Sequence, residues 1–238
     1  MPMRDIAAER SACAPFDMHS KCVIVTFHGV GEPNRSISAD EAAFWVDRAR
    51  FISMLDMLRD HPTVRITFDD GNESDILIAL PALQKRNLTA TFFVLSGQLD
   101  RAGFLSSAAV NELAAAGMTI GLHGWSHRPW PSLDAAELCR EFDHARAVLE
   151  DTLCAPVESA ACPYGAYDRR VLTALRSRHF THVYTSDRGW ARTDAWLQPR
   201  NTIMSHDDAN SVARLLLDRE SPGRSLMRQF RLMVKRLR

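Results

Sequence analysis

Short β-rich runs alternate with helical segments along most of the chain. Runs rich in β-branched and aromatic residues predict strands over 22–27, 64–68, 90–95, 118–122 and 157–161, with weaker ones over 182–186 and 201–204. Apolar residues at helical spacing predict helices over 40–58, 74–85, 107–116, 134–151, 168–178 and 208–218. This order of strand and helix predicts a parallel sheet covered by helices.

The number of these units favours one α/β barrel over a doubly wound sheet. No glycine-rich dinucleotide-binding fingerprint is present, and six or seven strand–helix units suit a barrel of parallel strands. A chain of 238 residues, of which 46% are apolar, can bury a single large core. We expect an N-terminal extension at 1–20, a barrel domain at 21–220 and a separate C-terminal helix at 221–238.

The charge of the chain is balanced overall but not along its length. Lys plus Arg and Asp plus Glu each number 29, so no overall field favours nucleic acid as a partner. From residue 221 onward the chain has six basic residues and no acidic one, and as a helix it would carry them opposite an apolar stripe. Such a basic amphipathic helix could pack on the barrel or make peripheral contact with an anionic membrane.

The N-terminal residues contain no apolar stretch typical of an export signal. No apolar run approaches the roughly 18 residues that a membrane-spanning helix needs. We therefore expect a cytoplasmic protein, located at the inner membrane face if the C-terminal helix binds lipid.

Two adjacent carboxylates, Asp69 and Asp70, end the second predicted strand in the sequence TFDDG. Asp is depleted in strands, and neighbouring negative charges repel each other unless a cation or hydrogen-bond donors stabilise them. A solvated turn or a helix N-cap would also explain the pair. The motif is therefore informative only together with its neighbours.

Two histidines, His123 and His127, follow a later predicted strand in GLHGWSH. Imidazoles four residues apart can chelate one cation, although a buried or surface histidine is the commoner explanation of a single one. The carboxyl ends of parallel strands lie on one face, where barrel active sites form. Asp70, His123 and His127 would then make a set of two nitrogens and one oxygen that leaves a position for water.

A third segment, CPYGAY at 162–167, follows the next predicted strand and could be a simple turn before a helix. Taken together, TFDDG, the spaced histidines and PYGAY resemble the polysaccharide deacetylase family, also called NodB-homology or carbohydrate esterase 4. The similarity runs from about residue 22 to residue 200. It implies a distorted (β/α) barrel of about seven strands in a single domain.

The resemblance also implies roles for these residues. Asp70, His123 and His127 match the family's metal ligands, with zinc expected and cobalt or nickel as alternatives. Asp69 matches the catalytic base, and Tyr164, after Pro163, would offer its backbone N–H to the oxyanion. The implied reaction removes the N-acetyl group from an amino sugar of a glycan or of a lipid-linked glycan.

The chain departs from the family pattern at two positions. No late strand supplies the usual histidine acid. His28 ends the first predicted strand, in an arrangement that resembles the permuted subgroup of poly-N-acetylglucosamine deacetylases, so we assign the general acid to His28, with His206 as the alternative. Ala161 stands where many members carry an arginine, and Arg200 could supply that cation.

Two further residues complete the predicted site. Asp187, after the sixth predicted strand, is a second candidate for the surroundings of Asp69, and Trp125 could stack on a sugar. Either Asp187 or Arg200 could instead be an ordinary surface charge. Two other functions stay open: a catalytically silent glycan-binding protein on the same fold, and a deformylase or amidase acting on another linear amide.

Overall fold

A computed structural model describes residues 21–217 and Lys235. The predicted N-terminal extension at 1–20 lies outside the described residues. The same holds for the predicted helix at 221–238, apart from Lys235, and for the membrane contact inferred from it. Within 21–217 and Lys235, no helix is both long enough and apolar enough to cross a bilayer.

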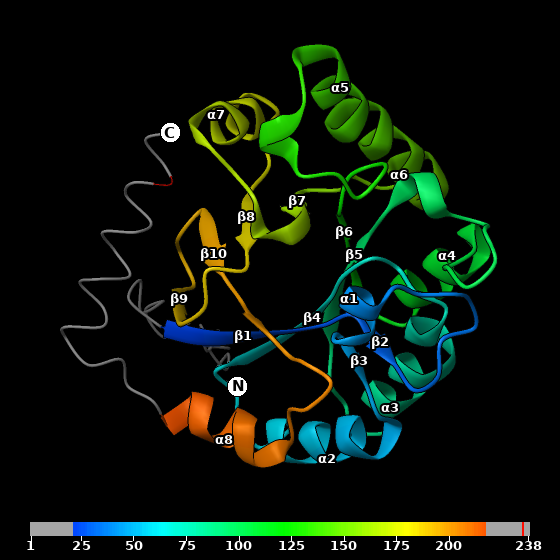
Figure 1. Cartoon of the computed structure of the whole chain (residues 1–238), viewed down its shortest axis with the longest axis vertical. Coiled ribbons are helices and arrows are strands. Elements are labelled where there is room, and N and C mark those ends of the chain that lie inside the picture. Colours follow the sequence, from blue (N-terminus) through cyan, green and yellow to red (C-terminus); the bar gives the residue numbers. More distant parts are fainter. Residues whose placement is uncertain (1–20, 218–234, 236–238) are drawn as a thin grey trace, which may run out of the picture.

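A nine-stranded sheet forms the centre of the molecule. Its strands are β1 (Lys21–Phe27), β4 (Val64–Phe68), β5 (Ala90–Val94), β6 (Thr119–Leu122), β7 (Ser159–Ala161), β8 (His182–Thr185), β9 (Trp190–Arg192), β10 (Leu197–Pro199) and β11 (Asn201–Thr202). Their order is β10-β8-β7-β6-β5-β4-β1-β11, with every neighbouring pair parallel, and β9 pairs antiparallel with β1. The sheet curls nearly into a barrel with helices outside it (Figure 1).

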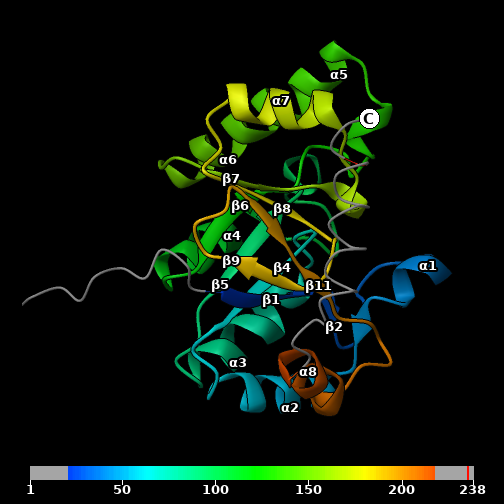
Figure 2. The ribbon, with the colours of Figure 1, turned by 90° about the vertical axis from the view of Figure 1, so that its left-hand side faces the viewer.

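This architecture confirms the predicted distorted (β/α) barrel of about seven parallel strands, because β10 and β11 are consecutive halves of the last strand. β10 pairs with β8 at one end of the sheet, and β11 pairs with β1 at the other. Arg200 alone separates the two halves, so the chain crosses from one end of the sheet to the other at this residue. β11 pairs with the second half of β1, and β9 pairs with the first half of β1 along the same edge (Figure 2).

Helices surround the sheet, and three of them are extended by helical turns of other types. The α-helices are α1 (Ala39–Ala42), α2 (Arg48–Leu58), α3 (Leu80–Gln84), α4 (Ser107–Ala115), α5 (Ala135–Cys139), α6 (Ala145–Leu153), α7 (Arg169–Ser177) and α8 (Ala209–Leu217). Two π-helical turns, η1 (Asp75–Ala79) and η4 (Arg140–His144), precede α3 and join α5 to α6. Three 3₁₀ turns are η2 (Ser96–Gln98), η3 (Trp130–Ser132) and η5 (Pro163–Gly165).

The single helix expected over 40–58 is wrong, because a second small sheet interrupts it. β2 (Gly29–Val30) pairs in parallel with β3 (Trp45–Val46), which lies between α1 and α2. The side chains of Trp45 and Val46 are buried, and the Trp45 ring packs directly on Gly29, where a Cβ would clash with it. Asp47 then caps α2 by accepting hydrogen bonds from two backbone N–H groups.

An aromatic ladder crosses the sheet just below the ends of its strands. Phe27, Phe68 and Phe92 stand in register on β1, β4 and β5, and all three are fully buried. Their ring centroids lie 5.5 Å and 4.6 Å apart in stacked pairs. Because this ladder fixes the register of neighbouring strands, it also fixes which residues meet where the strands end.

Candidate active site

The candidate residues leave the barrel at neighbouring strand ends. His28 follows β1, the pair Asp69–Asp70 follows β4, and His123 follows β6. Phe27 pairs with Phe68 in the sheet, so the next residues of the two strands, His28 and Asp69, are neighbours. The carboxyl ends of the parallel strands thus bring together groups from distant parts of the sequence.

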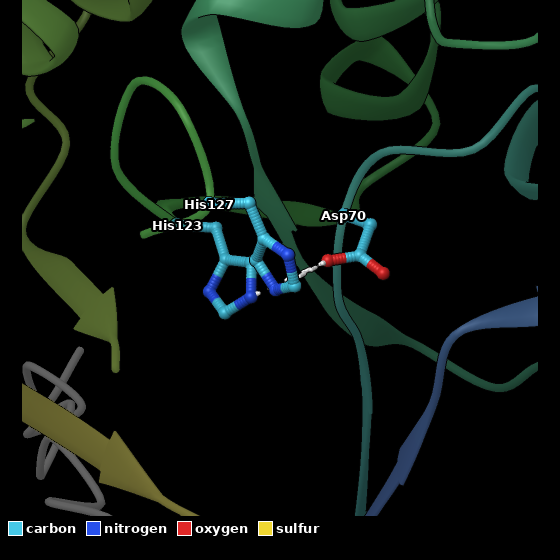
Figure 3. Close-up of side chains that lie close together, drawn as sticks. All are labelled: Asp70, His123 and His127. Carbon is cyan, nitrogen blue, oxygen red and sulfur yellow. Dashed lines mark ion pairs between the residues drawn. The ribbon is translucent and has the colours of Figure 1, made fainter. Parts of the chain in front are cut away.

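Asp70, His123 and His127 form a compact cluster (Figure 3). Their three ligand atoms lie within 4.8 Å of one another. The Asp70 Oδ1 atom is 3.5 Å from His123 Nε2 and 3.3 Å from His127 Nε2. This is the set of residues predicted from the sequence to bind a metal.

The cluster fits a divalent ion on three observations. The buried Oδ1 atom of Asp70 has no hydrogen-bond partner among the described residues. The Nδ1 atom of His123 lies 2.9 Å from the carbonyl oxygen of Ala161, which leaves Nε2 free to face the cluster. Bonds of about 2.0–2.1 Å at tetrahedral angles would separate two ligand atoms by about 3.3–3.4 Å. The distances from Asp70 Oδ1 to His127 Nε2 and His123 Nε2, 3.3 and 3.5 Å, are close to this value.

Asp69 is held by a buried ion pair with Arg200. The guanidinium donates two hydrogen bonds, from Nη1 to Oδ1 at 2.6 Å and from Nη2 to Oδ2 at 2.7 Å. Its Nη1 also lies 3.3 Å from Thr67 Oγ1, and the Arg200 side chain is completely buried. Arg200, which lies between β10 and β11 where the barrel closes, therefore supplies the cation that Ala161 cannot.

Burial alone would raise the pKa of Asp69, but the Arg200 guanidinium and the His123 imidazole outweigh it and lower that pKa. Burial likewise opposes ionisation of Asp70, while His123 and His127 hold its pKa far below the ordinary value. Burial lowers the pKa of His127, which favours the neutral imidazole that can bind a metal. The pKa of His123 is raised, because the carboxylates of Asp69 and Asp70 outweigh its burial.

His28 lies closer to this centre than the alternative acid does. Its charge is among the influences that lower the pKa of both Asp69 and Asp70. Its ring packs against Phe44 at 5.0 Å, and its buried Nδ1 has no partner within the described part of the chain. His206 is exposed in the turn before α8. Of the two candidates, His28 is therefore the one that lies beside the cluster.

The turn that follows β7 places Tyr164 beside the cluster. Pro163 is buried, whereas the Tyr164 side chain is 66% exposed and its ring centroid lies 4.4 Å from that of His127. The backbone of Tyr164 has a positive φ of 57°. No acceptor in the described residues takes its N–H, which therefore stays available to a ligand.

The other two predicted site residues lie further out. Asp187 accepts hydrogen bonds from Tyr167 Oη at 2.7 Å and Thr185 Oγ1 at 2.8 Å, and it forms an ion pair with Lys235. It thus stabilises the turn that carries Tyr164. The Trp125 ring packs against His144 and under Arg140, so the structure does not bring it to the cluster.

Sequence reasoning missed two buried acids beside the site, Asp75 and Glu141. Asp75 has both carboxylate oxygens buried and without a hydrogen-bond partner in the described residues. Glu141 holds the loop between the two histidines. A signal for Glu141 was present, because helical spacing from Leu138 and Ala145 places it on the apolar face of its helix.

The comparison with protein families agrees with this geometry. A family model described as polysaccharide deacetylase matches residues 58–183, which include Asp69, the metal cluster and the Tyr164 turn. The chain belongs to the polysaccharide deacetylase family.

Among curated members of related sequence, chitin deacetylase 1 of Cryptococcus neoformans is 30% identical over 119 residues, which are 50% of this chain and 24% of that protein. The chain spans less than half the length of the curated relatives it matches.

Solved deacetylase structures share the fold. The deacetylase PplD of Streptococcus pyogenes, solved with acetate, aligns with a TM-score of 0.72 at 19% identity, covering 83% of this chain and 98% of that one. IcaB from Ammonifex degensii aligns with a TM-score of 0.67 at 24% identity, covering 82% and 96% of the two chains. Both likenesses show that the nearly closed barrel is the fold of this family.

Proposed function

We propose that this protein hydrolyses the N-acetyl group of an amino sugar within a glycan, using a divalent ion, most simply zinc, at Asp70, His123 and His127. One observation carries the proposal: a carboxylate kept ionised by a buried arginine stands beside a cluster of three metal-binding side chains. Chitin deacetylases among the relatives support a glycan as the substrate.

Each residue has a role that its position supports. A divalent ion bound at the cluster supplies Lewis acidity toward the amide carbonyl and the attacking water. Asp69 accepts a proton from that water, and its lowered pKa keeps the carboxylate ionised near neutral pH. The Tyr164 N–H donates a hydrogen bond to the amide oxygen as negative charge builds on it.

Cleavage of the C–N bond also needs a proton on the departing nitrogen. His28 stands next to Asp69 at the end of the adjacent strand and can donate that proton. Acetate and a free amine are then the products. Both can be measured, which makes the proposal testable on simple oligomers of N-acetylglucosamine.

The first test compares the wild type, Asp69→Asn and a matched control, Asp151→Asn, after loading with zinc. We expect acetate release by Asp69→Asn to fall by about 10²–10⁴-fold, the contribution typical of a general base. The control changes an exposed aspartate on α6, so its activity should equal that of the wild type. Circular dichroism and zinc content show whether each variant is folded and loaded.

The alternatives give different results in the same experiment. A silent glycan-binding protein would release no acetate, and its affinity for the oligomers would be the same in the wild type and in Asp69→Asn. An amidase of another class would leave the oligomers intact but hydrolyse simple linear amides. Either result would refute N-acetyl hydrolysis of amino sugars.

A further inference from the structure

The loop between the two metal-binding histidines has no regular secondary structure of its own. Gly124 and His127 both adopt positive φ, at 89° and 55°. A residue with a Cβ seldom adopts a positive φ unless its surroundings impose it. The separation of the His123 and His127 imidazoles therefore depends on whatever holds residues 124–127 in place.

A buried carboxylate lies under this loop. Glu141, in η4, is only 3% exposed. Its Oε2 atom accepts a hydrogen bond from the Trp125 N–H at 2.7 Å, and its Oε1 and Oε2 atoms share the Ser126 N–H at 3.2 and 3.3 Å. The Ser126 hydroxyl donates to Oε1 as well. Gly124 completes the fit, because a Cβ there would clash with Glu141 Oε2.

The charge of Glu141 has no direct ion-pair partner among the described residues. A buried carboxylate without a counterion is costly unless several donors satisfy it. Here all of those donors belong to the loop: they are the backbone N–H of Trp125 and the backbone N–H and hydroxyl of Ser126. A shift of the loop would leave the carboxylate buried and unsatisfied, so Glu141 restricts the loop to one conformation.

We propose that Glu141 is a positioning residue that fixes the loop at 124–127, so that His123 and His127 meet Asp70 at a separation suited to chelation, and that it thereby sets the metal affinity. The inference rests on the proposed function, because it takes the cluster to hold a divalent ion. Groups that hydrogen-bond around metal ligands commonly change the affinity for the metal when they are replaced.

The test measures the affinity for Zn²⁺ by competition with a chromophoric chelator, in the wild type, Glu141→Gln and Glu112→Gln. Glutamine keeps the size of the side chain but turns one acceptor into a donor that faces the N–H groups of the loop. We expect zinc binding to weaken by about 10–100-fold. Glu112 is exposed on α4, so Glu112→Gln should bind zinc as the wild type does.

A second variant keeps the test decisive if Glu141→Gln does not fold. Ser126→Ala removes one donor to Glu141 and leaves the backbone N–H in place, so we expect a smaller, several-fold loss of zinc affinity. Saturating zinc should restore kcat in both variants, because the proposed defect lies in metal binding. A purely structural role would lower the Tm without changing the zinc affinity of the folded protein.

The two proposals fail in different ways. Wild-type zinc affinity in every folded variant would overturn the positioning role of Glu141 and leave the proposed function intact. A wild type that binds no zinc would overturn both. Zinc affinity is measured without any glycan, so a wrong choice of substrate does not affect the result.

Discussion

At the scale of single residues, the site depends on a charge pair whose members lie far apart in the sequence. The Cζ atom of Arg200 lies 5.1 Å from the ring centroid of Phe93 and 5.8 Å from that of Tyr184. The same guanidinium donates hydrogen bonds to both carboxylate oxygens of Asp69. A planar fork of donors matches a carboxylate better than an ammonium group does. The identity of this cation should therefore matter as much as its charge.

Arg200→Lys should keep a positive charge near Asp69 but lose the paired hydrogen bonds. Weaker stabilisation of the carboxylate raises the pKa of Asp69 toward its ordinary value, so the acidic limb of the kcat/KM profile should move to higher pH. Arg200→Met removes the charge and should cost about 3–5 kcal/mol of stability, because Asp69 stays buried without its partner. Unchanged pH profiles and urea denaturation curves would contradict the assigned role.

Asp75 is the opposite case, a buried carboxyl with no ion-pair partner in the described part of the chain. Burial and the nearby charges of Asp70 and Asp69 raise the pKa of Asp75 well above its ordinary value, and the Asn72 backbone opposes this only in part. As pH rises from the unfolded-chain pKa of about 3.9 through the raised folded value, the unfolded chain releases its proton first. The folded state therefore loses stability over this range.

Asp75→Asn removes that titration and should be more stable than the wild type at neutral pH. The gain should be about 1.4 kcal/mol for each unit by which folding raises the pKa of Asp75, and it should shrink as pH falls toward 4. Urea denaturation at several pH values measures it, with Asp151→Asn as the exposed control. A gain that does not depend on pH would show that Asp75 ionises normally in the folded protein.

At the scale of elements, the strands were the most predictable part of the chain. Parallel strands buried on both faces form nearly continuous apolar runs, as β1 and β5 do. The last strand was weak in the sequence because it is broken at Arg200, so that β11 pairs over only two residues. Asp134 and Glu137 form a capping box at the start of α5, where the predicted helix begins.

Elements that depend on tertiary contacts were not predictable. Trp45 and Val46 lie in a segment with helical spacing, yet they form β3, because burial of Trp45 against Gly29 outweighs helix propensity. Likewise, the motifs at Asp69–Asp70 and at His123–His127 were visible as local patterns. The roles of Glu141 and Asp75 depend on three-dimensional neighbours that a local pattern does not show.

At the scale of the whole molecule, the metal cluster joins loops after β4 and β6, on opposite sides of β5. An ion held by both loops binds the folded barrel and not the unfolded chain. Zinc should therefore raise the Tm, corresponding to about 2.7 kcal/mol when its concentration is 100 times the Kd. Differential scanning fluorimetry measures the shift, which Asp70→Ala should abolish. An equal shift in that variant would place the zinc elsewhere.

The crossing from β10 to β11 has a consequence for how the length of this chain can vary. Surface loops between helices and strands can gain residues at small entropic cost. Arg200 is the single residue between two paired half-strands, in a segment where successive side chains alternate between the two faces of the sheet. One inserted residue at this point would turn the guanidinium outward and leave Asp69 alone in the barrel. We therefore expect the fold to tolerate added residues in its surface loops but not between β10 and β11.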